Sequence, residues 1–244
     1  LKPKNIIAIT GTNGKTSVAD YFNQILNINK ISSASIGTLG IKLKKKYIKT
    51  NLTTPDSITL HKYLENFKKK KINNVIIEAS SHGLHQNRLD HINFKAGIFT
   101  NFSQDHLDYH KNMKKYLEAK LILFKKLLKI KKFIISDRGM EQYKVLEKIS
   151  KNKKLKLLDI SKKNYQIKNI PPLLSSLFQK KNLLMAIYAA KLCGLNDVKI
   201  NNSLKKIKNV SGRLELIREY PNNIKLFIDF AHTPDALSEV INSV

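Results

Sequence analysis

The stretch that decides the fold is "IIAITGTNGKTS", residues 6–17. Its apolar first half is typical of a buried strand, and the polar second half is typical of a phosphate-binding loop that leads into a helix. Gly14, Lys15 and Thr16 match the end of the common pattern G-x-x-x-x-G-K-[ST], but Ile9 stands where the first glycine belongs. The stretch therefore indicates either a variant phosphate loop or a strand-to-helix turn with an incidental lysine.

Outward from this stretch, short apolar runs alternate with segments of helical periodicity. The alternation predicts an α/β fold with a mainly parallel sheet that is covered by helices on both faces. Such sheets bind ligands at the carboxyl ends of their strands, so the polar residues after each strand share one location. We expect strands at 5–10, 74–79, 96–100, 132–137 and 155–160, and helices at 15–29, 58–70, 112–129, 139–150 and 178–194.

The pattern of residue types in the sequence changes after Gly212. Two apolar runs surround the turn "PNN", and "TPDA" then begins a helix, with Thr233 as N-cap and Pro234 at the first helical position. We expect a first domain at 1–212 and the start of a second at 213–244. The first residue, Leu1, and the final "ALSEVINSV" suggest a fragment of a longer polypeptide.

The formal net charge of +27 raises the possibility of a nucleic-acid-binding P-loop module. Only four of the 45 basic residues are arginines, whereas nucleic-acid sites favour the planar guanidinium. We therefore expect most of this charge to be solvated surface. Cys193 is alone, which excludes a disulfide framework and a cysteine metal site. No apolar run approaches 18 residues, so we expect a cytoplasmic protein without membrane insertion.

Two further polar clusters follow predicted strands. A carboxylate at the end of a buried strand needs a partner, and Mg²⁺ would suit Glu78 beside Lys15 and Thr16. The second cluster, "TNFSQDHLDYH" at 100–110, has two histidines and two aspartates in a short span. This spacing is compatible with a transition-metal site or with a polar loop that caps the helix near residue 112.

Seven motifs occur in order: "GTNGKT" (11–16), "TTPDS" (53–57), "EASSHGL…R" (78–88), "TNFSQDHLDYH" (100–110), "YLEAKLILF" (116–124), "GRLE" (212–215) and "DFAHTPDAL" (229–237). Together they resemble the Mur ligases over essentially the whole chain. The phosphate loop of that family lacks the first glycine, so Ile9 is expected. Within the family, the second and last motifs favour the branch that joins a free amino acid to UDP-MurNAc-dipeptide in peptidoglycan biosynthesis.

The resemblance implies an ATP-dependent amide ligase that forms an acyl phosphate and releases ADP and phosphate. It implies a monomer with a Rossmann-like C-terminal domain, ATP and Mg²⁺ as cofactors, and no specific nucleic-acid partner. Lys120 matches the carbamylated lysine (N6-carboxylysine) of the family, and Gln179 stands where the family usually has asparagine. The implied residues are Gly11, Thr12, Asn13, Gly14, Lys15, Thr16, Asn182, Arg213 and Asp229 for ATP; Thr53, Thr54, Ser80, Gln86 and Arg88 for the UDP-linked substrate; Thr16, Glu78, His106 and Lys120 for metal; and Lys15, Glu78, His106 and Lys120 for catalysis.

Two alternatives to this branch remain. A folylpolyglutamate synthetase or another paralogue would share the phosphate loop but differ at "TTPDS" and Arg88. A non-catalytic relic would bind ATP weakly or not at all.

Overall fold

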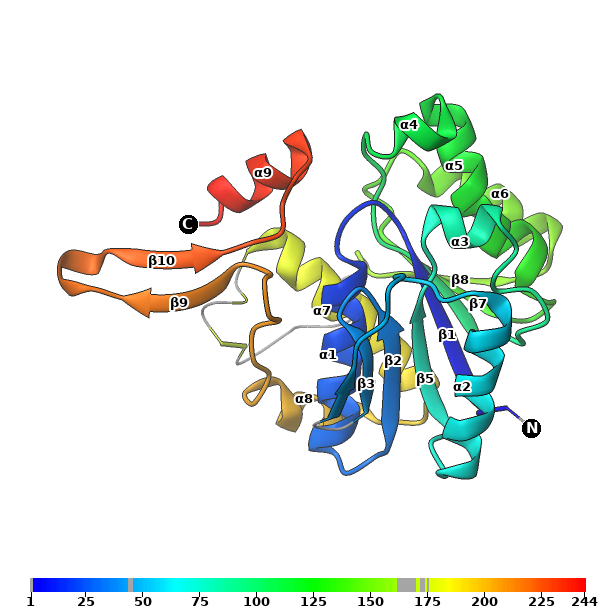
Figure 1. Cartoon of the computed structure of the whole chain (residues 1–244), viewed down its shortest axis with the longest axis horizontal. Helices are drawn as coiled ribbons and strands as arrows, with labels where there is room; N and C mark the ends of the chain where they lie inside the picture. Colours follow the sequence, from blue (N-terminus) through cyan, green and yellow to red (C-terminus); the bar gives the residue numbers. More distant parts are fainter. Residues whose placement is uncertain (1, 44–45, 162–169, 172–173, 175) are drawn as a thin grey trace.

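The computed structural model describes residues 2–43, 46–161, 170–171, 174 and 176–244. Among these residues, eight strands form one sheet and two form a separate hairpin. The order in the larger sheet is β4-β3-β2-β5-β1-β6-β7-β8 (Figure 1). The strands are β1 (Asn5–Thr10), β2 (Ser33–Gly37), β3 (Gly40–Leu43), β4 (Lys46–Ile48), β5 (Asn74–Glu78), β6 (Ala96–Phe99), β7 (Phe133–Ser136), β8 (Lys156–Asp159), β9 (Glu215–Glu219) and β10 (Lys225–Ile228).

The six strands from β2 to β8 in this order run parallel, and at one edge β3 pairs antiparallel with both β2 and β4. The predicted α/β class with a mainly parallel sheet is confirmed. The helices are α1 (Lys15–Ile28), α2 (Ser57–Lys69), α3 (Ser81–His85), α4 (Leu107–His110), α5 (Met113–Ile122), the π-helix η1 (Leu123–Leu127), α6 (Tyr143–Asn152), α7 (Leu177–Leu192), α8 (Asp197–Leu204), the 3₁₀ turn η3 (Pro221–Asn223) and α9 (Pro234–Ile241).

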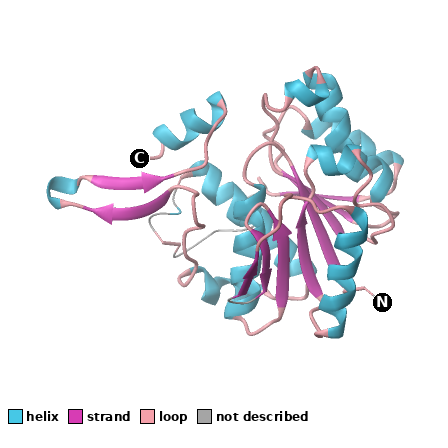
Figure 2. Ribbon diagram, in the orientation of Figure 1, coloured by secondary structure: helices cyan, strands magenta, loops and turns pink. Residues whose placement is uncertain are grey.

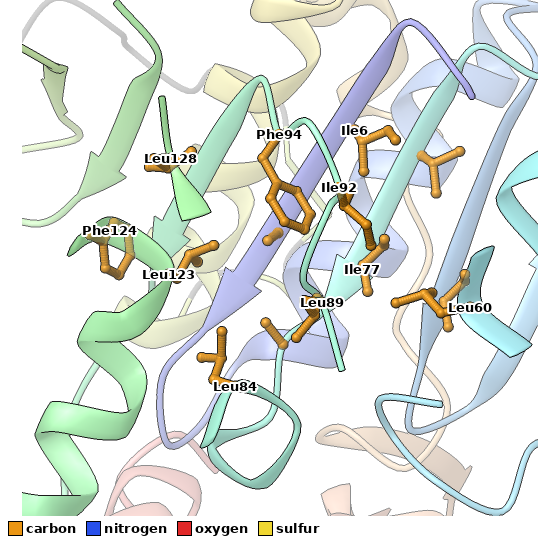
Figure 3. Packing of buried hydrophobic residues seen from close by; sticks show 14 of the residues in the cluster. Ile6, Leu60, Ile77, Leu84, Leu89, Ile92, Phe94, Leu123, Phe124 and Leu128 are labelled. Atoms are coloured by element: carbon orange, nitrogen blue, oxygen red, sulfur yellow. The ribbon is translucent and has the colours of Figure 1, made fainter. Parts of the chain in front are cut away.

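The central strand β1 is buried on both faces because successive side chains point to opposite sides of the sheet. Ile6 and Ala8 join one hydrophobic core, with α2, α3, η1 and α6. Ile7 and Ile9 join the other core, with α1, α7 and α8. Figure 3 shows the first core around Phe94. The continuous apolar run in β1 therefore follows from helices on both sides of the sheet.

Most predicted elements agree with the structure to within a few residues at their ends. The strand β2 was not predicted, because Ser33–Gly37 reads Ser-Ala-Ser-Ile-Gly and has one large apolar residue. The segment predicted as a helix over 112–129 is helical from Met113 to Leu127, but it changes from an α-helix to a π-helix after Ile122, and Leu128 is extended. The helix predicted from residue 139 begins only at Tyr143.

The C-terminal segment forms the antiparallel hairpin β9–β10, followed by α9. Figure 2 shows the hairpin projecting from the body that contains the larger sheet. Thr233 is the N-cap of α9, as predicted, because its hydroxyl accepts a hydrogen bond from the Ala236 amide at 3.3 Å. The boundary at 212 stays a prediction.

Candidate functional site

The phosphate loop lies between the end of β1 and the start of α1, at the carboxyl edge of the sheet (Figure 1). Gly11 and Gly14 have φ values of 142° and 84°, which favour glycine over other residues. The Asn13 amide donates to Oδ1 of Asn101 at 2.8 Å, so the motif after β6 holds the loop. Because α1 begins at Lys15, its first amides and the positive end of its dipole face the loop.

Two lysines converge on the loop. Nζ of Lys15 donates to the carbonyl oxygens of Gly11 and Thr12 at 2.9 and 2.6 Å. Nζ of Lys120, on α5, donates to the same Gly11 oxygen at 2.8 Å and lies 4.2 Å from the centroid of the Tyr116 ring. Burial lowers the pKa of both lysines, and for Lys120 the positive charge of Lys15 adds to the effect. The pKa of Lys120 lies well below its ordinary value, so its amine is poised to be neutral.

Glu78 ends β5 and is buried beside the start of α1. One carboxylate oxygen accepts the hydroxyls of Thr16 and Thr38, both at 3.1 Å, and the other accepts the Thr38 amide at 3.2 Å. Burial raises the pKa of Glu78, while Lys15 and these hydrogen bonds oppose the rise. A buried carboxylate beside a threonine hydroxyl and a phosphate loop matches the oxygen ligands that Mg²⁺ prefers.

His106 lies after β6 with φ of 51°, and its ring lies close to the side chains of Asp105, His82 and Tyr116. Its Nε2 is 3.4 Å from Oδ2 of Asp105, and its ring meets that of His82 edge-on with centroids 5.0 Å apart. Burial lowers the pKa of His106, and the charges of Lys120 and Lys15 lower it further, against the opposing effect of Asp105. The imidazole is therefore biased toward its neutral, metal-binding form.

Four of the five predicted substrate residues form one connected group, whereas the fifth, Thr53, has its hydroxyl 3.2 Å from that of Thr38. The Thr54 hydroxyl donates to the backbone oxygen of Glu78 at 2.7 Å and to Oγ of Ser80 at 3.0 Å. The Arg88 guanidinium donates to the backbone oxygen of Thr54 at 2.7 Å and to the side chain of Gln86. The Ser80 hydroxyl also caps α3 by accepting from the Gly83 amide at 3.0 Å.

Two simpler interpretations of sequence features are not borne out. An arginine two residues before an aspartate could simply form an ion pair with it, but Asp90 pairs with Lys126 at 2.8 Å and not with Arg88. A helix cap was an alternative role for the cluster at 100–110, but Asn112 caps α5 instead, by accepting from the Lys115 amide at 2.9 Å.

Asn182 reaches the phosphate loop from α7. A Cβ built on Gly14 would lie 2.5 Å from Oδ1 of Asn182, so the two residues are in close contact. Gln179 is buried one turn earlier and accepts a hydrogen bond from the Ser176 hydroxyl at 2.9 Å. Asp137, at the end of β7, pairs with Lys181 of α7 at 2.7 Å.

The C-terminal segment faces the phosphate loop. A guanidinium nitrogen of Arg213 lies 3.4 Å from the Thr16 hydroxyl, and Asp229 accepts a hydrogen bond from the Leu214 amide at 2.6 Å. Nε2 of His232 is 3.8 Å from Oδ2 of Asp105, across the gap between the segment and the body. His232 therefore reaches across to the body, while Thr233 provides the helix cap.

These groups surround a cavity of about 510 Å³. Its lining combines the phosphate loop, the motif at 100–110, α7 and the C-terminal segment. The predicted residues that line it are Thr12, Asn13, Gly14, Lys15, Thr16, Thr53, Ser80, His106, Lys120, Asn182, Arg213 and Asp229, whereas Gly11, Thr54, Glu78, Gln86 and Arg88 lie behind the wall or beside it.

Sequence reasoning missed several residues of this site. Thr38 follows the unpredicted strand β2, so its position at the carboxyl edge gave no signal. Asp137 ends the predicted strand 132–137 and directly follows β7, so the rule that ligands bind at the carboxyl ends of parallel strands would have indicated it. Phe230 lines the cavity and lies under the Arg213 guanidinium, 5.2 Å from ring centroid to Cζ.

Neither of two other candidate features is found in the described part of the chain. Across the ranges given above, no three His, Cys, Asp or Glu side chains gather as a metal site, so the transition-metal interpretation of the motif at 100–110 gains no support. None of the helices in those ranges has the length and apolar character to cross a membrane. Cys193 is half-buried, and burial raises the pKa of its thiol to about 12.

Comparisons with known proteins agree with this geometry. Residues 9–190 match the Mur ligase middle domain. The UDP-N-acetylmuramoyl-L-alanyl-D-glutamate–2,6-diaminopimelate ligase of Leptospira interrogans is 36% identical over 271 residues, which cover 100% of this chain and 53% of that protein. The ligase of the same name from Wigglesworthia glossinidia brevipalpis is 35% identical over 267 residues, which cover 98% of this chain and 53% of that protein. The chain therefore spans about half the length of the curated relatives it matches.

Two solved structures show the same fold. A UDP-N-acetylmuramoyl-L-alanyl-D-glutamate–2,6-diaminopimelate ligase superposes with a TM-score of 0.81 at 27% identity, covering 100% of this chain and 54% of that one. A bifunctional folylpolyglutamate synthase/dihydrofolate synthase from Yersinia pestis, complexed with AMPPNP and Mn, gives 0.75 at 17% identity, covering 98% and 65%. At that identity the second likeness concerns the fold alone.

The sheet order, the phosphate loop after its central strand and the cavity at its carboxyl edge define a P-loop α/β protein. Within that class, the chain belongs to the Mur ligase family.

Proposed function

We propose that this protein is an ATP-dependent amide ligase of the MurE type, which joins a free amino acid to UDP-MurNAc-dipeptide in peptidoglycan biosynthesis. The observation that carries the proposal is the shared cavity, in which the phosphate loop, Lys120 and the C-terminal segment face one another. Full-length relatives at about 35% identity have names that specify this substrate class and 2,6-diaminopimelate as the amino acid. We therefore propose 2,6-diaminopimelate as the first amino acid to test.

In this proposal the loop residues Gly11–Thr16 bind the triphosphate through backbone amides and Lys15. Asn182, beside Gly14, would contact the adenosine side, and Arg213 and Asp229 would approach from the C-terminal segment. The domain division at 212, a cytoplasmic location and a monomeric state belong to the same proposal.

Mg²⁺ would be held by the Thr16 hydroxyl and the Glu78 carboxylate, with His106 and a carbamylated Lys120 near a second ion. The fit rests on the buried Glu78 carboxylate, which lies between Thr16 and Thr38 beside the loop. The bound ion would neutralise phosphate charge during transfer. The chain supplies few protein ligands, which agrees with the preference of Mg²⁺ for substrate oxygens and water.

The environment of Lys120 supports carbamylation. Burial and the charge of Lys15 lower the pKa of Lys120, which favours the neutral amine, and a neutral amine can form a bond to the carbon of CO₂ with loss of one proton. The product is a carboxylate, so the side chain would change from a neutral donor into an anionic ligand. Lys15 at the shared Gly11 oxygen would then face an opposite charge.

The chemistry has two steps. A carboxylate oxygen of the dipeptide attacks the γ-phosphorus, the bond to the β-phosphate oxygen breaks, and ADP leaves. The amine of the amino acid then attacks the acyl carbon, phosphate leaves with the C–O bond electrons, and the nitrogen loses a proton. Thr53, Thr54, Ser80, Gln86 and Arg88 would orient the acceptor, while Lys15 neutralises the transferred phosphoryl group.

The test is phosphate release by the complete protein with MgATP and defined substrates. We expect release only when UDP-MurNAc-dipeptide and an amino acid are both present, and Lys15→Ala should lower the rate by at least about 100-fold. Lys205→Ala, at an exposed lysine that does not line the cavity, should leave the rate unchanged. Release stimulated by a folate and glutamate, and not by UDP-MurNAc-dipeptide, would instead identify a folylpolyglutamate synthetase.

A further inference from the structure

The opposite edge of the sheet has an unusual charge. The amino ends of β2, β5, β1, β6, β7 and β8 and the loops before them lie there, because parallel strands place all their amino ends at one edge. We call residues 2–5, 29–32, 68–73, 91–95, 129–133 and 151–156 the amino-edge surface. Half of the residues of this surface are lysines, and none is an aspartate or a glutamate. The lysines are Lys2, Lys4, Lys30, Lys68, Lys69, Lys70, Lys71, Lys95, Lys129, Lys131, Lys132, Lys151, Lys153, Lys154 and Lys156.

Backbone hydrogen bonds join these segments into one continuous edge. The Asn5 amide donates to Asn73 at 2.8 Å, which links the segments before β1 and β5. The Phe133 amide donates to Lys95 at 3.2 Å, which links the segments before β6 and β7. The Lys131 amide donates to Lys154 at 3.0 Å and links β7 to β8. The lysines therefore belong to one surface and are not scattered along the chain.

Little of this charge is neutralised by carboxylates. In the described ranges, the amino-edge lysines with a carboxylate partner are Lys69 with Glu65 at 2.9 Å and Lys151 with Glu147 at 3.8 Å, both on exposed helix surfaces. Lys153 donates to backbone oxygens instead, which leaves its charge uncompensated. Exposed pairs of this kind contribute little and are screened by salt.

Drift in base composition would spread lysine over every surface and would not sort charges by edge. At the carboxyl edge, the segments that follow the strands hold charges of both signs: Asp56, Asp105, Asp137 and Glu141 occur together with Lys15, Arg88, Lys111 and Arg138. The two edges of one sheet therefore differ, because the amino edge carries lysines without any carboxylate, and this edge lies opposite the cavity.

We infer that the amino-edge surface docks the protein on anionic lipid headgroups, with the cavity facing the aqueous side. Lysine is a point charge that suits headgroup phosphates without base readout, and this surface has no arginine. Its two phenylalanines, Phe94 and Phe133, are buried and half-buried, so the imidazole of His91 is its one exposed aromatic ring. Ile130 is 61% exposed between Lys129 and Lys131, where it would meet the lipid interface.

The test measures sedimentation of the 244-residue chain with phosphatidylcholine vesicles that contain or lack phosphatidylglycerol. We expect binding only to the anionic vesicles, with affinity falling as salt rises. The triple variant Lys129→Gln, Lys131→Gln and Lys132→Gln should weaken binding by at least about tenfold, since each lysine near an anionic membrane contributes about a fivefold factor.

The matched control removes the same charge from the other side of the molecule, through Lys111→Gln, Lys114→Gln and Lys115→Gln, all at exposed positions. It should keep the binding of the unmodified chain. If circular dichroism shows that the first variant is unfolded, a second triple variant, Lys4→Gln, Lys70→Gln and Lys154→Gln, takes its place. The inference would be overturned if the amino-edge variant and the control variant lost the same affinity for anionic vesicles, or if the unmodified chain bound neutral vesicles equally well. Tighter binding to single-stranded RNA than to anionic vesicles at the same salt would also overturn it.

Discussion

Lys15 and Lys120 donate to the same carbonyl oxygen, that of Gly11, at 2.9 and 2.8 Å. The two lysines come from different helices, and Lys120 has only 1% of its surface exposed. Burial lowers the pKa of each lysine, and the charge of Lys15 lowers that of Lys120 further. The lowered pKa of Lys120 has consequences that can be measured.

Lys120→Met should stabilise the ligand-free protein near neutral pH. Burial lowers the folded-state pKa of Lys120 below the ordinary 10.5, so unfolding takes up a proton at pH values between the two. The contribution of Lys120 to the free energy of unfolding therefore rises with pH up to about 10.5. The advantage of the methionine variant should shrink over the same range, as measured by urea denaturation at several pH values without bicarbonate.

Lys114→Met on the same helix provides the control, because Lys114 is exposed. Its stability, measured over the same pH range, gives the effect of removing one lysine charge from the surface of this helix. An advantage of Lys120→Met that is constant with pH would contradict the lowered pKa.

Gly14→Ala and Gly194→Ala separate backbone strain from contact with the site. Both glycines have positive φ, 84° and 97°, so each substitution should lower the free energy of unfolding by about 1–2 kcal/mol. Only at Gly14 would the new Cβ meet another side chain, Asn182, at 2.5 Å; nothing lies within 4 Å at Gly194. Calorimetry with MgATP should show at least a tenfold loss of affinity for Gly14→Ala and no loss for Gly194→Ala.

Gly37→Ala should disturb the proposed metal site directly. A Cβ at Gly37 would overlap Oε1 of Glu78, and Gly37 does not have a positive φ, so the displaced carboxylate is the main effect. We expect ATP affinity in the presence of Mg²⁺ to fall by roughly tenfold, while affinity measured with EDTA is unchanged. The overlap should lower the free energy of unfolding by about 1–3 kcal/mol. A Mg²⁺ dependence like that of the unmodified protein would argue against Glu78 as a ligand.

The coupling free energy between Asp105 and His232 should be small. The atoms are 3.8 Å apart and the His232 side chain is 67% exposed, so solvent screens the pair. A double-mutant cycle with Asp105→Asn and His232→Gln should give a coupling of about 1 kcal/mol or less in ATP binding. A coupling near 3 kcal/mol would mean that this pair, and not packing around Phe230, holds the C-terminal segment over the cavity.

The sequence was sufficient for the parts of the fold that rest on local pattern. β1 and α1 followed from an apolar run, two glycines and a helical period, all within 6–28. Strand β2 could not be predicted, because its small residues carry no strand pattern and are buried by tertiary neighbours, the strands β3 and β5 and helix α1. The early end of α5 escaped notice because the apolar residues continue through Leu123, Phe124 and Leu128.

In the candidate site, too, some residues could be predicted from local sequence and others could not. Lys15, Thr16 and Glu78 were found because residue type and strand-end position point to phosphate and metal. Lys120 was found only through family resemblance, since one lysine among 41 gives no local signal. Its burial and its contact with Gly11 arise from the packing of α5 against α3, which depends on tertiary structure.

The cavity is built from both ends of the chain, and this imposes an order in time during synthesis. About 200 residues separate Lys15 from Arg213, yet both line the same space. At about 5–20 residues per second, the ribosome needs roughly 10–40 s between them. A nascent chain would thus carry a phosphate loop long before the C-terminal segment exists to face it, and the completed cavity can form only after that segment leaves the exit tunnel.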